Sequence, residues 1–112
     1  MGVETRADVQ LAAKLFRGFG DPTRLAILEE LAAAGELRVK DLLERLGGSQ
    51  STISGHVGCL KDCGLVSDRP DGRQVFYRLA APEVVAALRA AEELLAVSGQ
   101  HIELCPNYRS DR

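Results

Sequence analysis

The 112-residue sequence lacks what a β-sandwich, a membrane span or a disulfide scaffold needs. Aromatic residues make up only 4% of the chain and tryptophan is absent, whereas leucine, alanine, glutamate and arginine are abundant, which favours a helical domain. Charged residues interrupt every apolar run well before the roughly 18 residues that a membrane span requires. The first ten residues have no signal-peptide pattern. We therefore expect a cytoplasmic protein that contacts no membrane and has one modest core.

Cysteine is too scarce for a disulfide framework, since the chain has three. In a reducing compartment such thiols serve as metal ligands, reactive groups or core residues. The formal net charge is −2, so nucleic-acid binding would have to use a local surface. Enzyme motifs are also lacking, because the sequence has no phosphate-binding glycine-rich loop, no nucleophile elbow and no histidine and acid beside a cysteine. We therefore expect no enzymatic activity.

Helical periodicity and glycine stops predict four helices in the first half of the chain. Asp21-Pro22 is a strong helix start, in which Asp21 caps the free amides. Gly47-Gly48 ends a short helix, Ser49 caps the next, and Gly64 closes that helix in a left-handed conformation. The predicted helices run to about residue 18, over 22–34, over 39–46 and from 50 to about 63.

After the fourth helix the pattern changes to that of a β-hairpin. Residues 65–69 and 74–79 read as two short strands, joined by the turn sequence Pro-Asp-Gly-Arg at 70–73. Pro82 then opens a last amphipathic helix, and a polar tail covers residues 98–112. The predicted fold is mainly α with a β-hairpin, in the order ααααββα.

A short helix, a tight turn, a polar-faced helix and a hairpin are typical of a winged helix-turn-helix, whose fourth helix here would enter the major groove of DNA. The first turns of that helix lack acidic residues, which favours DNA binding over an ordinary solvated face. Its outward side chains suit base edges and phosphates: Ser49, Gln50, Ser51, Thr52, Ser54 and His56. The hairpin adds arginines for phosphate contacts: Arg69, Arg73 and Arg78.

Four motifs then follow one another: FGDPTRLAIL from Phe19, SQSTISGHV from Ser49, LKDCGLV from Leu60 and DGRQVFY from Asp71. Over about residues 10–97 they resemble the ArsR/SmtB family of metalloregulatory repressors. The resemblance implies a homodimer, paired through its first and last helices, that binds an inverted-repeat operator in double-stranded DNA and releases it when a metal or metalloid binds. Many relatives have Pro and His where this chain has Ser and Gly at 51 and 55, so the operator sequence does not carry over.

The first and last helices carry apolar stripes that are too wide for so small a core to cover. We expect a dimer interface that includes Leu11, Leu15, Val84, Leu88 and Leu95. Residues 1–97 are then a winged helix-turn-helix domain for DNA binding and dimerisation, and residues 98–112 a tail that carries a metal-ligand cysteine.

Cys59 and Cys63 lie one helical turn apart, so their thiols are close enough to share an ion. Two sensor sites of relatives are absent, because Arg38-Val39-Lys40 replaces a Cys-Val-Cys pattern and residues 82–97 contain no Asp or His. The arrangement resembles the cadmium- and lead-sensing actinobacterial subgroup of the family. That resemblance implies a Cd(II) or Pb(II) site made by Cys59, Cys63 and Cys105, with Cys105 donated by the partner subunit.

Other interpretations stay open at this point. As(III) also accepts three thiolates, while Zn(II) normally takes a fourth ligand, for which His101 is a weak candidate that we expect to be solvated. Cys59 and Cys63 would alternatively be small core residues. A thiol redox switch that joins Cys105 to one of the pair, and a module that binds only proteins, are the remaining alternatives.

Overall fold

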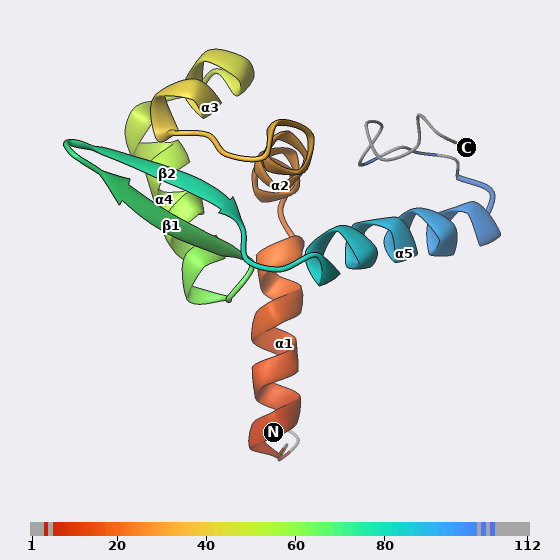
Figure 1. Cartoon of the computed structure of the whole chain (residues 1–112). Helices are drawn as coiled ribbons and strands as arrows, with labels where there is room; N and C mark the ends of the chain where they lie inside the picture. The colour runs from red at the N-terminus through yellow and green to blue at the C-terminus, as the bar shows by residue number, and fades with distance from the viewer. Residues whose placement is uncertain (1–3, 5, 101, 103, 105–112) are drawn as a thin grey trace.

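The structure, a computed structural model, describes residues 4, 6–100, 102 and 104. Its elements follow the predicted order ααααββα, with five helices and one antiparallel hairpin (Figure 1). The elements are α1 (Ala7–Phe19), α2 (Pro22–Ala34), α3 (Val39–Leu46), α4 (Gln50–Asp62), β1 (Val66–Asp71), β2 (Gln74–Leu79) and α5 (Glu83–Val97). In Figure 1, α2, α3, α4 and the hairpin form one body, from which α1 and α5 extend in different directions.

The core lies where α2, α3 and α4 meet. Ile27 and Leu28 from α2, Leu42 from α3 and Leu60 from α4 are fully buried. Leu88 of α5 joins the same core at 1% exposure. Full burial of each such side chain contributes about 1.5–3 kcal/mol, so these contacts determine how the helices pack.

The ends of α4 follow the predicted capping. The Ser49 hydroxyl accepts a hydrogen bond of 3.2 Å from the Thr52 amide at the start of the helix. Beyond its end, Gly64 has a φ of +79°, the left-handed conformation that glycine adopts without a steric penalty. Ile53 and Val57 bury the inner face of the helix. Local signals therefore define both ends of the predicted recognition helix.

The start of α2 corrects one prediction. Asp21 occupies the position before the helix and Pro22 its first turn, as expected, but the Asp21 side chain makes no capping hydrogen bond. One of its carboxylate oxygens lies 3.8 Å from Nδ1 of His56 in α4. The prediction that Asp21 caps the free amides of α2 is therefore wrong, because its carboxylate lies beside a ring that the fold brings next to it.

The hairpin turn is shorter than predicted. Asp71 pairs with Gln74, so the connection is the two residues Gly72-Arg73, and Gly72 has a φ of +64°. Pro70 lies within β1 rather than in the turn, which is tolerated because a two-stranded sheet has only edge strands. Backbone hydrogen bonds of 2.8 and 3.0 Å between Leu37 and Tyr77 join the hairpin to the segment before α3.

Among the described residues, no helix combines the length and the apolar character that crossing a membrane would take.

Gly58 and Gly64 provide a matched test of the α4 boundary, because a Cβ atom at either position would meet no other atom within 4 Å. Gly64→Ala should lower the free energy of unfolding by about 1–2 kcal/mol, since alanine disfavours a positive φ. Gly58→Ala, inside the helix, should raise it by about 0.5–1 kcal/mol. Urea denaturation measures both changes, and two changes of the same sign would contradict this account.

Candidate nucleic-acid interface and cysteine site

A polar groove of about 370 Å³ lies between the start of α3, the first turns of α4 and the hairpin. Gln50 and Ser54 of α4 line one part of it. The groove also contains cations and an amide from the other two elements: Arg38, Lys40, Arg73 and Gln74. Positive side chains hold phosphates and amide or hydroxyl groups read base edges, so this mixture suits duplex DNA.

The hydroxyl groups at the start of α4 hydrogen-bond to one another. Ser49 donates a hydrogen bond of 2.9 Å to Thr52, and its oxygen lies 3.3 Å from that of Ser51. All three residues are exposed. This cluster is thus on the surface, beside the polar groove, where the sequence analysis expected DNA contacts.

Arg38 and Lys40 are groove residues that the sequence analysis missed. Arg38 donates two hydrogen bonds to Asp41, of 2.9 and 2.8 Å, and one of 3.3 Å to Gln74. The Arg38 guanidinium lowers the pKa of Asp41 to about 2. Arg38 therefore holds the start of α3 against β2, while Lys40 in the first turn of α3 is exposed. The sequence signal that could have identified Lys40 is a positive charge in the helix that precedes the recognition helix.

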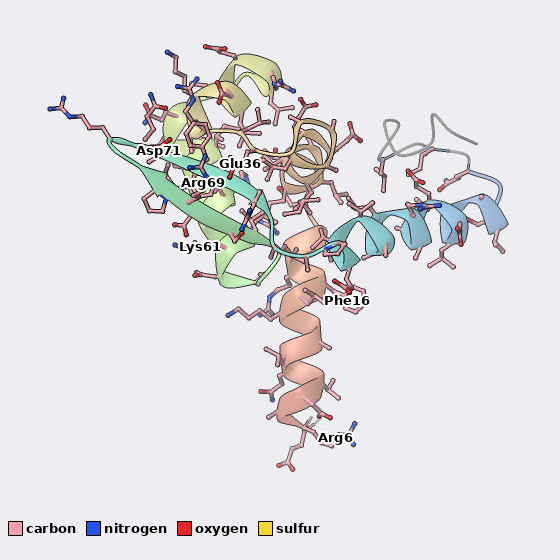
Figure 2. The ribbon with its side chains drawn as sticks, in the orientation of Figure 1. Arg6, Phe16, Glu36, Lys61, Arg69 and Asp71 are labelled. Carbon is pink, nitrogen blue, oxygen red and sulfur yellow. The ribbon has the colours of Figure 1, made fainter. Side chains whose placement is uncertain are left out.

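The guanidinium of Arg69 has partners within the chain. It donates two hydrogen bonds of 2.9 Å to Glu36, and the two side chains are labelled in Figure 2. It also lies over the Phe76 ring, 4.9 Å from its centroid. The hydrogen bond from Arg69 lowers the pKa of Glu36 below its usual value. Arg69 therefore orients the hairpin in the free protein, and its contact with phosphate stays a prediction. Arg73, in the turn, and Arg78, on β2, are exposed.

His56 also has neighbours within the chain. Its side chain is 23% exposed, and its Nδ1 lies 3.4 Å from Nη1 of Arg24 and 3.8 Å from the Asp21 carboxylate. The imidazole therefore packs between α4 and α2. The contact of His56 with a base edge stays a prediction.

The two described cysteines line one cavity of about 240 Å³ between α4 and α1. Cys59 is exposed and Cys63 is half-buried. Three cations line the same cysteine cavity: Lys14, Arg17 and Arg24. Asp62 lines the cavity as well. Two thiolates balance the charge of a divalent ion, and a third thiolate would make the complex anionic and attract it to these cations.

The donor set of the cysteine cavity fits a thiophilic ion that takes its remaining ligand from elsewhere. Cys59 and Cys63 supply two sulfur atoms. Within the described part of the chain, no group of three or more His, Cys, Asp or Glu residues lies close enough to hold a metal ion. Cys105, the predicted third ligand, and His101 both lie outside the described residues.

The terminal helices leave large apolar side chains uncovered. Leu11 is 69% and Leu15 38% exposed on α1, consistent with a surface for a partner. Leu95 is half-buried. Val84 and Leu88 correct the interface prediction, because the chain buries them in its own core at 6% and 1% exposure. Other apolar side chains are exposed near them in the sequence: Phe16, Leu94 and Val97.

Residues 21–68 match the family described as bacterial regulatory protein, arsR family. An uncharacterized HTH-type transcriptional regulator of Methanocaldococcus jannaschii is 40% identical over 74% of this chain and 93% of its own length. The probable mercury resistance operon repressor of Streptomyces lividans is 37% identical over 83% of this chain and 74% of its own. The arsenical resistance operon repressor of Escherichia coli is 44% identical over 62% of this chain and 60% of its own length.

Two solved structures have the same fold. The homodimeric winged helix-turn-helix DNA-binding domain of a possible ArsR-family regulator from Mycobacterium bovis has a TM-score of 0.71 and 28% identity, covering 92% of this chain and 99% of that one. The cadmium metal-sensor CMTR from Mycobacterium tuberculosis has a TM-score of 0.60 and 41% identity, and the match covers 70% of this chain and 80% of that one. Together with the geometry above, these similarities establish that the chain belongs to the ArsR family of bacterial regulatory proteins and has a winged helix-turn-helix fold.

Proposed function

We propose that the chain is a homodimeric repressor that releases operator DNA when Cys59, Cys63 and Cys105 bind Cd(II) or Pb(II). The observation that carries this proposal is the pair of thiols in one cavity on α4, the helix that also lines the polar groove. Residues 1–97 would bind DNA and dimerise, and residues 98–112 would supply the third sulfur. Two copies of α4 would then read half-sites about one helical turn, roughly 34 Å, apart.

The choice of metal rests on the donor atoms. Three thiolates suit Cd(II) and Pb(II), whereas a structural Zn(II) normally takes a fourth ligand. As(III) also accepts three sulfur ligands, and the Escherichia coli relative named above is an arsenical repressor. Cd(II) or Pb(II) is our first choice, because Cys59 and Cys63 with a later tail cysteine resemble the cysteine arrangement of the cadmium- and lead-sensing subgroup.

The course of the tail supports a third ligand from the partner subunit. The Leu104 amide donates a hydrogen bond to the buried carboxylate of Glu92, and Leu104 lines an apolar hollow with Phe16 and Phe19 of α1. Lys14 and Gly18 line the cysteine cavity. Because each residue of a helix turns by about 100°, these two residues lie on the side of α1 opposite to Phe16. A tail that starts from Leu104 would have to pass around α1 to reach the thiols of its own chain.

Release of DNA by added ions tests the proposed function directly. A duplex selected from a random library by the metal-free protein is bound first, under strictly reducing conditions. Cd(II) or Pb(II) should then weaken binding by roughly 5–150-fold, the range expected for coupling of about 1–3 kcal/mol. Fluorescence anisotropy measures the affinity, with As(III) and Zn(II) added in parallel. Release by As(III) but not by Cd(II) or Pb(II) would replace the proposed inducer, and no release by any ion would refute metal control.

Mixed dimers test the source of the third ligand. Cys59→Ser or Cys63→Ser should abolish the ultraviolet absorption of sulfur bound to Cd(II), because the pair is lost. Cys105→Ser should weaken this absorption and uncouple metal binding from DNA release.

When Cys59→Ser/Cys63→Ser subunits are mixed with Cys105→Ser subunits, ligation between chains should give each heterodimer one complete three-sulfur site. Absorption that shows no recovery after verified subunit exchange would rule out the shared site.

Arg73 tests the DNA interface. Arg73→Ala should weaken binding to all duplex sequences alike and lower the slope of log affinity against log salt by about one, because one phosphate contact is lost. Arg45→Ala is the matched control, since Arg45 pairs with Glu30 at 3.1 Å and does not line the polar groove. Equal slopes for Arg73→Ala, Arg45→Ala and the unaltered protein would refute the assignment of Arg73.

A further inference from the structure

The thiol of Cys63 contacts the backbone of α1. Its Sγ donates a hydrogen bond of 3.3 Å to the carbonyl oxygen of Lys14. A thiol donates only while it is protonated, whereas a metal ligand must be a thiolate. Metal binding at Cys63 therefore removes a contact between α4 and α1, and the released proton goes to solvent.

The packing around this contact is tight. Gly18 of α1 is buried, and a Cβ atom at this position would lie 2.8 Å from Cδ1 of Leu65. The same atom would lie 3.2 and 3.3 Å from Cβ and Sγ of Cys63. The backbone of α1 thus lies directly against Cys63, and a side chain at position 18 would crowd Cys63 as well as the flexible end of Leu65.

Arg24 joins the same part of α1 to the helix-turn-helix. Its guanidinium donates hydrogen bonds of 2.7 Å to the carbonyl of Arg17 and 3.2 Å to that of Gly18. It also lies 3.4 Å from the imidazole of His56 in α4. These contacts hold the C-terminal turns of α1, while its N-terminal part extends away from the body of the protein (Figure 1).

Distance favours a mechanical route from the thiols to the DNA. Gln50 and Cys59 differ by nine positions in α4, which places them on opposite sides of the helix and about 14 Å apart along its axis. The Debye length at physiological salt is about 8 Å, so negative charge added at the cysteine cavity is largely screened at the polar groove.

We propose, on the basis of the function above, that Cys63 holds α1 against α4 in the metal-free protein and that metal ligation frees α1 to move. α1 exposes Leu11 and Phe16 at 69% and 70%, the apolar surface that a second copy of this chain would cover. Movement of α1 relative to α4 therefore changes the separation of the two α4 helices in a dimer. Operator binding requires that separation to match the half-site spacing.

The test reproduces the metal-bound state without metal. Gly18→Ala keeps every cysteine but places a methyl group 3.2 and 3.3 Å from Cβ and Sγ of Cys63, which should widen the contact between α1 and Cys63. Its metal-free affinity for the selected duplex should therefore fall by about 5-fold or more, within the range typical of such coupling. It should still show the ultraviolet absorption of sulfur bound to Cd(II). Cys63→Ala, which lacks a donor, should weaken metal-free DNA binding more than Cys63→Ser, and more than the matched variant Cys59→Ala.

A second measurement uses the unaltered protein. Amide hydrogen exchange in the C-terminal turns of α1 should be faster with Cd(II) than without it. Metal-free Gly18→Ala should exchange these amides faster than the metal-free unaltered protein does. Circular dichroism and sedimentation verify that each variant is folded and dimeric.

The results separate this inference from the proposed function. If Cd(II) releases DNA from the unaltered protein, but Gly18→Ala and Cys63→Ala bind the duplex as tightly as it does without metal, the role of the Cys63 contact is overturned and the repressor function stands. Unchanged exchange in α1 on Cd(II) binding would also overturn it. If no added ion releases DNA from the unaltered protein, the proposed function and this inference are both refuted.

Discussion

The burial of one side of α4 is the constraint on which the other functional features of this protein depend. Ile53, Val57 and Leu60 lie at i, i+4 and i+7 and are at most 2% exposed. Once this stripe is buried, the rotation of the helix about its axis is fixed, and so is the direction of every other side chain on it. Gln50 faces the hairpin and α3, while Cys59 faces α1. One helix thereby presents two chemically different sides to two different neighbours.

The hairpin depends on contacts outside itself, since an isolated two-stranded sheet is marginally stable. Lys61 pairs with Asp68 at 2.7 Å, which ties the end of α4 to β1. Arg38 and Arg69 lie 5.8 and 4.9 Å from the centroid of the Phe76 ring. Exposed ion pairs and cation–π contacts each contribute only about 0–1 kcal/mol. The orientation of the hairpin thus results from several weak contacts.

The order of the elements was predictable because its signals are local. Pro22, the glycine pair at 47–48, Ser49 and Gly64 act on residues within one or two turns of themselves, and each marks a boundary of the structure. The pairing of Cys59 and Cys63 in one cavity was predictable for the same reason, since it follows from the helical repeat.

The contacts that sequence reasoning did not foresee join residues far apart along the chain. Arg69 meets Glu36 across 33 positions and His56 meets Arg24 across 32, so no local pattern announces either contact. Val84 and Leu88 have the periodicity of an interface and of a core alike, and only the packing of α5 distinguishes the two. Lys40 was noted only because it stands where relatives have a metal-ligand cysteine. Its place in the polar groove could not be predicted, since the groove forms only where α3 and β2 meet.

The position of Pro70 inside β1 has a consequence for self-association. In the described part of the chain the sheet is the pair β1 and β2, and the Leu37 bridge covers part of the free side of β2. β1 is then the edge to which a strand of another molecule could add, and open edges of this kind template aggregation. Pro70 has no amide hydrogen, and the charged residues Asp68 and Arg69 precede it in the strand. An incoming strand would find an interrupted ladder and charges to desolvate, so the hairpin resists edge-to-edge association.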